Sequence, residues 1–191
     1  FVKRFAIRFN APVVLSFAIL SLLVLVLDSA TGGASTARLF CVYRAPLTDP
    51  LTYVRFFTHV LGHSGYSHYM SNMLLLLLVG PGLEEKYGSR NLLLTIVITA
   101  LATGLVQFLL FPHSALLGAS GVVFMMIVLS SFTEMKKGGI PLTMLLVVAL
   151  YLGSEIADGL TKTDNVSHLT HIVGGVCGIF FGFRLAKAKK H

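Results

Sequence analysis

The stretch NLLLTIVITALATGLVQFLLFPHSALLGASGVVFMMIVLSSFT, from Asn91 to Thr133, contains no Asp, Glu, Lys or Arg. As one helix rising about 1.5 Å per residue it would be about 65 Å long, roughly twice the hydrocarbon thickness of a bilayer. It therefore has to fold back, and the proline-containing turn FPHS at 111–114 is the best place for it to do so. The stretch predicts two membrane-spanning helices, at about 91–111 and 115–133.

The rest of the chain has the same character. Of its 191 residues, 55% are apolar and 12% are charged, whereas about a quarter of the residues in soluble domains are charged. We therefore predict an all-α membrane protein in which one polytopic domain covers 1–191. Its six helices are expected at about 9–27, 67–83, 91–111, 115–133, 139–156 and 166–186, and a long extracytoplasmic loop joins the first two.

The basic residues predict the orientation of these helices. If the spans alternate in direction, most of the lysines and arginines fall on one side, which the positive-inside rule makes the cytoplasmic side, together with both termini. Because the net charge of +7 is spread over short clusters between apolar runs, we expect a lipid bilayer and not nucleic acid as the partner. The predicted inner residues are Lys3, Arg4, Arg8, Lys86, Arg90, Lys136, Lys137, Arg184, Lys187, Lys189 and Lys190, and the outer ones are Arg38, Arg44, Arg55 and Lys162.

Polar side chains inside three of the spans are the candidate functional residues. Such groups cost a few kcal/mol within a membrane unless they are paired or face a cavity. His68 and Asn72 lie four residues apart, and so share one face of the second predicted helix. Ser120 lies in the first turns of the fourth predicted helix and His171 about one turn into the sixth, so that all four side chains are expected at one depth in the outer half of the bilayer.

The combination of Ser120 with His171 predicts acyl-transfer chemistry. A serine hydroxyl is a weak nucleophile that needs a neighbouring base, and small residues on both helices would let them approach closely enough to provide one. Because no carboxylate lies near His171, we predict a dyad that needs no metal and no cofactor. His68, the Asn72 amide and the Ser120 backbone N–H are the candidate donors for an oxyanion.

Three other interpretations remain open at this stage. Taken alone, Ser120 also suits a packing role, and the polar residues around it suit structural hydrogen bonds between helices. The pairs His59 with His63 and His168 with His171 could bind zinc in a metal transporter or a metal-dependent enzyme. However, no HExxH pattern and no paired broken helices accompany these histidines. A catalytically inactive protein that only binds transmembrane segments is the third alternative.

Three motifs, in order along the chain, resemble those of the rhomboid intramembrane serine proteases, particularly the bacterial GlpG type with its six-helix core. They are HSGYSHYMSN at 63–72, GASG at 118–121 and HIVGGVCG at 171–178. The resemblance implies a serine endopeptidase that cleaves transmembrane proteins in or near their membrane spans. It implies a catalytic dyad of Ser120 and His171, an oxyanion hole of His68, Asn72 and the Ser120 amide, and a bacterial inner-membrane location with the active site open to the periplasm.

The resemblance also implies supporting roles for several residues. Glu84 resembles a structural glutamate of the family at the inner end of the second helix, and Arg55 resembles the arginine of its Trp-Arg pair. Val54 replaces that tryptophan, and Phe124 replaces a tyrosine that stacks on the catalytic histidine. Substrates are expected to enter past the fifth helix, beneath a cap at 153–165. The small residues implied to support the site are Gly118, Gly121, Gly174 and Gly178.

Overall fold

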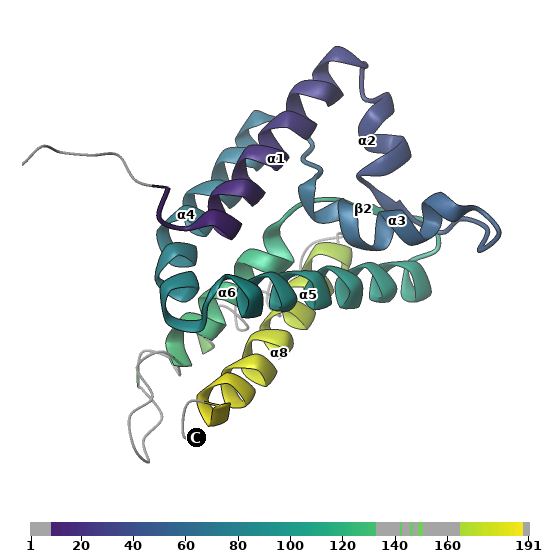
Figure 1. The fold of residues 1–191 in the computed structure, drawn as a ribbon. Coiled ribbons are helices and arrows are strands. Elements are labelled where there is room, and N and C mark those ends of the chain that lie inside the picture. Colours follow the sequence, from purple (N-terminus) through teal and green to yellow (C-terminus); the bar gives the residue numbers. More distant parts are fainter. Residues whose placement is uncertain (1–8, 133–141, 143–145, 147–148, 151–164, 189–191) are drawn as a thin grey trace, which may run out of the picture.

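The computed structural model describes residues 9–132, 142, 146, 149–150 and 165–188, and it is mostly helical (Figure 1). Three of its helices are long and apolar enough to cross a membrane: α1 (Pro12–Ala30), α5 (Ser89–Leu110) and the 168–185 part of α8 (Asn165–Ala188). The protein is therefore a multi-pass membrane protein. The predicted fifth helix at 139–156 and the predicted cap at 153–165 lie almost entirely outside the described residues.

Two further helices complete the described bundle. α4 (Tyr66–Tyr87) has the same length as α5 but is more polar. α6 (Ser120–Ser131) is shorter and is buried over nearly its whole length, between α4, α5 and α8. An apolar helix without a polar face belongs in such a central position. The predicted spans at 9–27, 67–83, 91–111 and 166–186 overlap α1, α4, α5 and α8, respectively.

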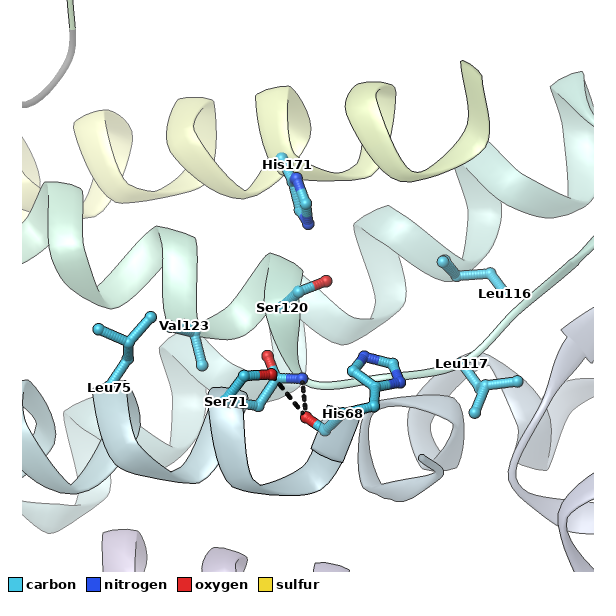
Figure 2. Close-up of a pocket in the computed structure, with 9 residues that line it drawn as sticks. His68, Ser71, Leu75, Leu116, Leu117, Ser120, Val123 and His171 are labelled. Atoms are coloured by element: carbon cyan, nitrogen blue, oxygen red, sulfur yellow. Dashed lines mark hydrogen bonds between the residues drawn. The ribbon is translucent and has the colours of Figure 1, made fainter. Parts of the chain in front are cut away.

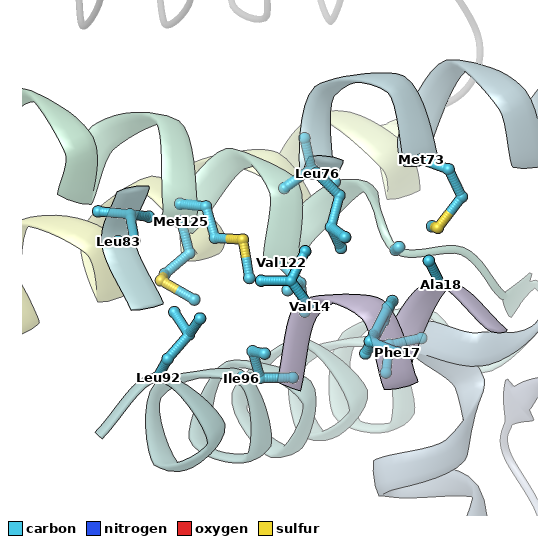
Figure 3. Close-up of a cluster of buried hydrophobic side chains, with 14 of the residues drawn as sticks. Val14, Phe17, Ala18, Met73, Leu76, Leu83, Leu92, Ile96, Val122 and Met125 are labelled. Carbon is cyan, nitrogen blue, oxygen red and sulfur yellow. The ribbon is translucent and has the colours of Figure 1, made fainter. Parts of the chain in front are cut away.

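The main hydrophobic core lies where α1, α4, α5 and α6 meet (Figure 3). Val14 from α1 reaches α4 at Gly80, where an added Cβ would lie only 2.7 Å from a Val14 methyl group. The core side chains include Val14, Phe17, Met73, Leu76, Leu83, Leu92, Ile96, Val122 and Met125. This packing holds α6 against α1, α4 and α5, and Phe181 of α8 also belongs to the cluster.

The predicted helix at 115–133 begins later than expected. Ala115–Leu116 forms a short strand, β2, that pairs antiparallel with β1 (Val42–Tyr43), with Val42 opposite Leu116. Gly118 then has a φ of +123°, which a helix does not allow, and α6 starts at Ser120. The prediction of helix at 115–119 was wrong because an apolar run carries no signal for pairing with a strand more than seventy residues away. Among the described residues the fold is thus helical, apart from this two-residue strand pair.

The segment between α1 and α4 is folded and contains four elements. They are α2 (Ala34–Leu39), β1, α3 (Pro50–Thr58) and the 3-10 turn η1 (His59–Leu61). Arg55 joins three of these elements from a buried position. Its Nε donates to the Arg38 carbonyl at 2.9 Å, its Nη1 pairs with the Asp49 carboxylate at 3.2 Å, and its guanidinium lies 4.6 Å from the Tyr43 ring centroid.

Glu84 connects the far end of α4 with the start of α1. Its buried carboxylate accepts the backbone N–H groups of Val13 at 2.9 Å and Val14 at 3.0 Å, and the Ser89 hydroxyl at 2.7 Å. The N-cap residue of α1, Ala11, has no side chain that could do this. A carboxylate at a helix N-terminus satisfies orphan donors and complements the helix dipole. Glu84 therefore caps α1 from seventy residues away in the sequence.

We expect Glu84→Gln to destabilise the protein by about 2 kcal/mol, because a neutral amide accepts fewer and weaker hydrogen bonds than a buried carboxylate. Thermal unfolding in detergent measures the effect. Glu85→Gln is the matched control, since Glu85 is exposed and its substitution should change the free energy of unfolding by less than about 0.5 kcal/mol. Equal effects of the two substitutions would contradict the capping role.

Candidate active site

A cavity of about 340 Å³ lies between α4, α6 and α8. The structure brings the four predicted polar residues, His68, Asn72, Ser120 and His171, to its wall. Figure 2 shows the His171 ring extending from α8 toward Ser120 at the start of α6, with His68 on the facing helix. The other lining residues are Ser71, Leu75, Leu116, Leu117 and Val123.

The position of His171 relative to Ser120 depends on a contact between two backbones. A Cβ added at Gly174 would lie 2.2 Å from the carbonyl oxygen of Gly121, and one added at Gly178 would lie 2.6 Å from that of Met125. Only glycine fits at these positions. Ser120 directly precedes Gly121, and His171 lies one helical turn before Gly174. The close approach of α6 and α8 therefore brings the two polar residues to the same level of the bundle.

Phe124 packs against His171 in this arrangement. The two rings are stacked, with centroids 6.0 Å apart and planes at 23° to each other, and Phe124 is fully buried. Gly175 leaves the space for the phenyl ring, because an added Cβ there would lie 2.9 Å from it. The contact limits the orientations open to the imidazole. Phe124 has no hydroxyl group, unlike the tyrosine that it replaces.

The opposite wall of the cavity holds groups that can donate hydrogen bonds. Asn72 is buried, and its Nδ2 donates to the His68 carbonyl at 3.0 Å, which leaves its second amide hydrogen for another acceptor. Ser120 is the first residue of α6, whose N-cap Ala119 offers no capping side chain. The first N–H groups of a helix lack partners within the helix and attract negative charge. This wall suits a developing oxyanion.

Gly118 packs against the His68 ring. A Cβ added at Gly118 would lie 2.9 Å from Nε2 of His68, so the close approach of backbone and imidazole requires glycine here. The Gly118 N–H donates to the His59 carbonyl at 2.9 Å, which ties the turn before α6 to η1. Gln107 holds the chain on the other side of β2, because its Nε2 donates to the Ser114 carbonyl at 3.0 Å.

His59 and His63 are buried beside the site and contact backbone carbonyls. His59 Nε2 lies 3.0 Å from the Ala100 carbonyl, and His63 Nδ1 lies 3.1 Å from the Leu61 carbonyl. Among the described residues, no three His, Cys, Asp or Glu side chains come together in a way that could hold a metal ion. The His63 and His68 rings are in edge-to-face contact, with centroids 5.0 Å apart.

Five lining residues were not predicted from the sequence. Leu75 could have been found, since it lies one turn after Asn72 on the same face of α4. Leu116 and Leu117 could not, because their positions follow from the strand pairing of β2. They give the cavity an apolar side next to its polar groups.

These features define a helical, multi-pass membrane protein with a polar cavity at one end of its bundle. The model of the rhomboid domain matches residues 50–188. The chain belongs to the rhomboid family. The family prediction made from the three motifs is thus confirmed, and the finer assignment to the GlpG type stays a prediction.

Several curated proteins are similar to this chain. Rhomboid-related protein 1 of Caenorhabditis elegans is 32% identical over 138 residues, which are 68% of this chain and 39% of that protein. The chloroplastic rhomboid-like protein 11 of Arabidopsis thaliana is 26% identical over 70% of this chain and 52% of its own length. The rhomboid protease GluP of Bacillus subtilis is 25% identical over 83% of this chain and 32% of its own length. The chain therefore spans between 32% and 52% of the length of these relatives.

We expect Gly174→Ala to separate α6 from α8, because the new methyl group would collide with the Gly121 carbonyl. Overpacking of this kind costs about 1–3 kcal/mol, measurable as a lower melting temperature in detergent. Gly82→Ala is the matched control, since nothing lies within 4 Å of a Cβ at that helical position. It should be neutral or slightly stabilising. If Gly174→Ala behaves like the control, the two helices are not in backbone contact.

Acid is expected to destabilise the protein through two buried histidines. Burial lowers the pKa of His59 to about 4, and burial together with the nearby His68 lowers the pKa of His63 to about 4. Both have a pKa of about 6.5 in an unfolded chain. As the pH falls, the unfolded chain binds these protons first, so the free energy of unfolding decreases between about pH 6.5 and about pH 4.

Melting temperatures across this pH range test the prediction. The double variant His59→Gln, His63→Gln should show a weaker pH dependence than the wild type, whatever its stability near neutral pH. A melting temperature that is constant over the range would show that these histidines do not change protonation on unfolding.

Proposed function

We propose that the chain is an intramembrane serine endopeptidase that hydrolyses peptide bonds in or near transmembrane segments of membrane proteins, with Ser120 and His171 as its catalytic dyad. One observation carries the proposal. Ser120, His171 and the donors His68 and Asn72 come from three different helices and line one cavity. Membership of the rhomboid family supports it, since one similar protein, GluP, is named a rhomboid protease.

In the proposed reaction, Ser120 Oγ attacks the carbonyl carbon of the scissile peptide while His171 accepts the hydroxyl proton. The oxyanion that forms accepts hydrogen bonds from His68, from the Asn72 amide and from the Ser120 backbone N–H. When the C–N bond breaks, His171 gives its proton to the leaving amine. Water then attacks the acyl-enzyme with His171 again acting as base, which releases the carboxylic acid and restores Ser120. No cofactor is needed.

The proposed setting is a bacterial inner membrane, with a GlpG-type core of six helices and both termini in the cytoplasm. Lys86, Arg90 and Arg184 lie at the helix ends opposite Ser120, which supports an inner location for those ends and an outer, periplasmic opening of the cavity. Many of the exposed side chains of α1 and α5 are large and apolar, which suits contact with lipid. The proposed partners are the bilayer and transmembrane substrates, with no role for nucleic acid.

The metal-dependent alternative has less support. His59 and His63 make hydrogen bonds to backbone carbonyls, and their rings lie within the folded segment before α4. An inactive protein that only binds helices is the stronger competitor, because the fold alone would serve both functions. Reactivity of the serine separates an active enzyme from such a protein.

Ser120 is expected to react with a fluorophosphonate probe in detergent, and mass spectrometry identifies the labelled residue without knowledge of the substrate. His171→Ala should slow labelling by about 100-fold or more, because the general base is lost. His113→Ala, at an exposed histidine in the turn before β2, is the matched control and should react like the wild type.

EDTA should leave the labelling unchanged. Labelling that disappears with EDTA would favour the metal-dependent alternative. Folded protein that is not labelled at all would contradict the proposed function and favour an inactive, helix-binding role.

A further inference from the structure

The His68 side chain reaches back from the first turn of α4 to the segment before the helix. The N-cap residue is Gly65, which has no side chain to offer, and His68 is the third residue of the helix. Its Nδ1 accepts the Ser64 backbone N–H at 3.4 Å and lies 3.1 Å from the Ser64 hydroxyl. In a capping box the third residue reaches back to the N-cap N–H, whereas His68 contacts the residue before the N-cap.

This contact determines which nitrogen of His68 carries the proton. A backbone N–H can only donate, so Nδ1 has to keep its lone pair to accept from Ser64. In a neutral imidazole the proton then resides on Nε2. The Ser64 hydroxyl can rotate to donate to Nδ1 as well, which further favours the same tautomer.

The protonated nitrogen lies on the cavity side of the ring. Nε2 of His68 lies over Gly118, two residues before Ser120, and His68 lines the cavity with Ser120 and His171. With its proton there, Nε2 can donate to an oxyanion formed at Ser120. With the proton on Nδ1, Nε2 would instead present a lone pair to the developing negative charge.

We infer that Ser64 is a positioning residue that fixes the Nε2–H tautomer of His68 and thereby supplies the oxyanion hole with a hydrogen-bond donor. The inference rests on the proposed function, because the tautomer affects catalysis only where an oxyanion forms. Ser64 is exposed and acts through His68. A serine that only stabilised the start of α4 would change the stability of the protein and leave the protonation of the His68 ring unchanged.

The tautomer can be read directly by ¹⁵N NMR of the protein labelled at its histidines, in proteoliposomes. In the wild type, His68 Nδ1 should be unprotonated and Nε2 protonated. Ser64→Ala removes the hydroxyl, which is the nearer of the two Ser64 groups to Nδ1, and leaves only the longer contact with the backbone N–H. It should therefore increase the fraction with a proton on Nδ1, and Ser64→Thr, which keeps a hydroxyl, should restore the wild-type spectrum. Ser67→Ala, at an exposed serine of the same turn, is the matched control. A wild-type His68 protonated on Nδ1 would overturn the inference.

Labelling of Ser120 by a fluorophosphonate tests the consequence. Ser64→Ala should lower the maximal labelling rate about ten-fold, part of the roughly 100-fold or greater loss that follows complete removal of a donor. The half-saturating probe concentration should stay the same, and Ser64→Thr and Ser67→Ala should react like the wild type. In a His68→Ala background, Ser64→Ala should have no further effect.

A wild-type rate in Ser64→Ala, or an equal loss in the His68→Ala background, would overturn the inference while the wild type is still labelled. Absence of labelling in the wild type would instead contradict the proposed function. The NMR spectrum needs no activity, so in that case it alone decides whether Ser64 fixes the tautomer.

Discussion

The close contact between α6 and α8 is the constraint on which the site depends. Two apolar helices gain little from burying hydrophobic surface against each other in a bilayer, because lipid tails are equally apolar. Their association needs close packing, and here Gly174 lies directly over the Gly121 carbonyl. The positions of Ser120, His171 and the stacked Phe124 all follow from this contact. Any larger side chain at Gly174 would move the predicted base away from the predicted nucleophile.

The start of α6 is held independently by the segment before α4. Strand β2 pairs with β1, and the Gly118 N–H donates to the His59 carbonyl. Arg44 adds to this from beside β1, since its guanidinium donates to the Phe108 carbonyl at 2.7 Å and to that of Leu109 at 2.9 Å, in the last turn of α5. The start of α6, with the Ser120 N–H, is therefore held by the segment between α1 and α4, whereas His171 is held on α8.

The sequence predicted those features that depend on local patterns. Charge-free runs predicted five of the described helices, although α6 begins later than expected, and the glycines after His171 indicated a helix contact. Two contacts could not be predicted from the sequence: the strand pairing of Ala115–Leu116 and the capping of α1 by Glu84. The partners lie about seventy residues away, and backbone pairing leaves no local signature. Resemblance to a family pointed to Glu84 as structural but did not identify the groups it contacts.

A site for hydrolysis inside a bilayer has to accommodate polar groups that the membrane penalises. The structure places them near helix ends: Ser120 is the first residue of α6, His68 lies in the first turn of α4 and His171 lies in the second turn of α8. Helix ends already carry backbone groups without partners in the helix. The Ser120 N–H has no partner within α6, and in the proposed reaction it donates to the oxyanion. The inferred role of His68 also depends on a helix end, because the hydrogen bond from the Ser64 N–H, just before α4, leaves the proton of a neutral ring on Nε2.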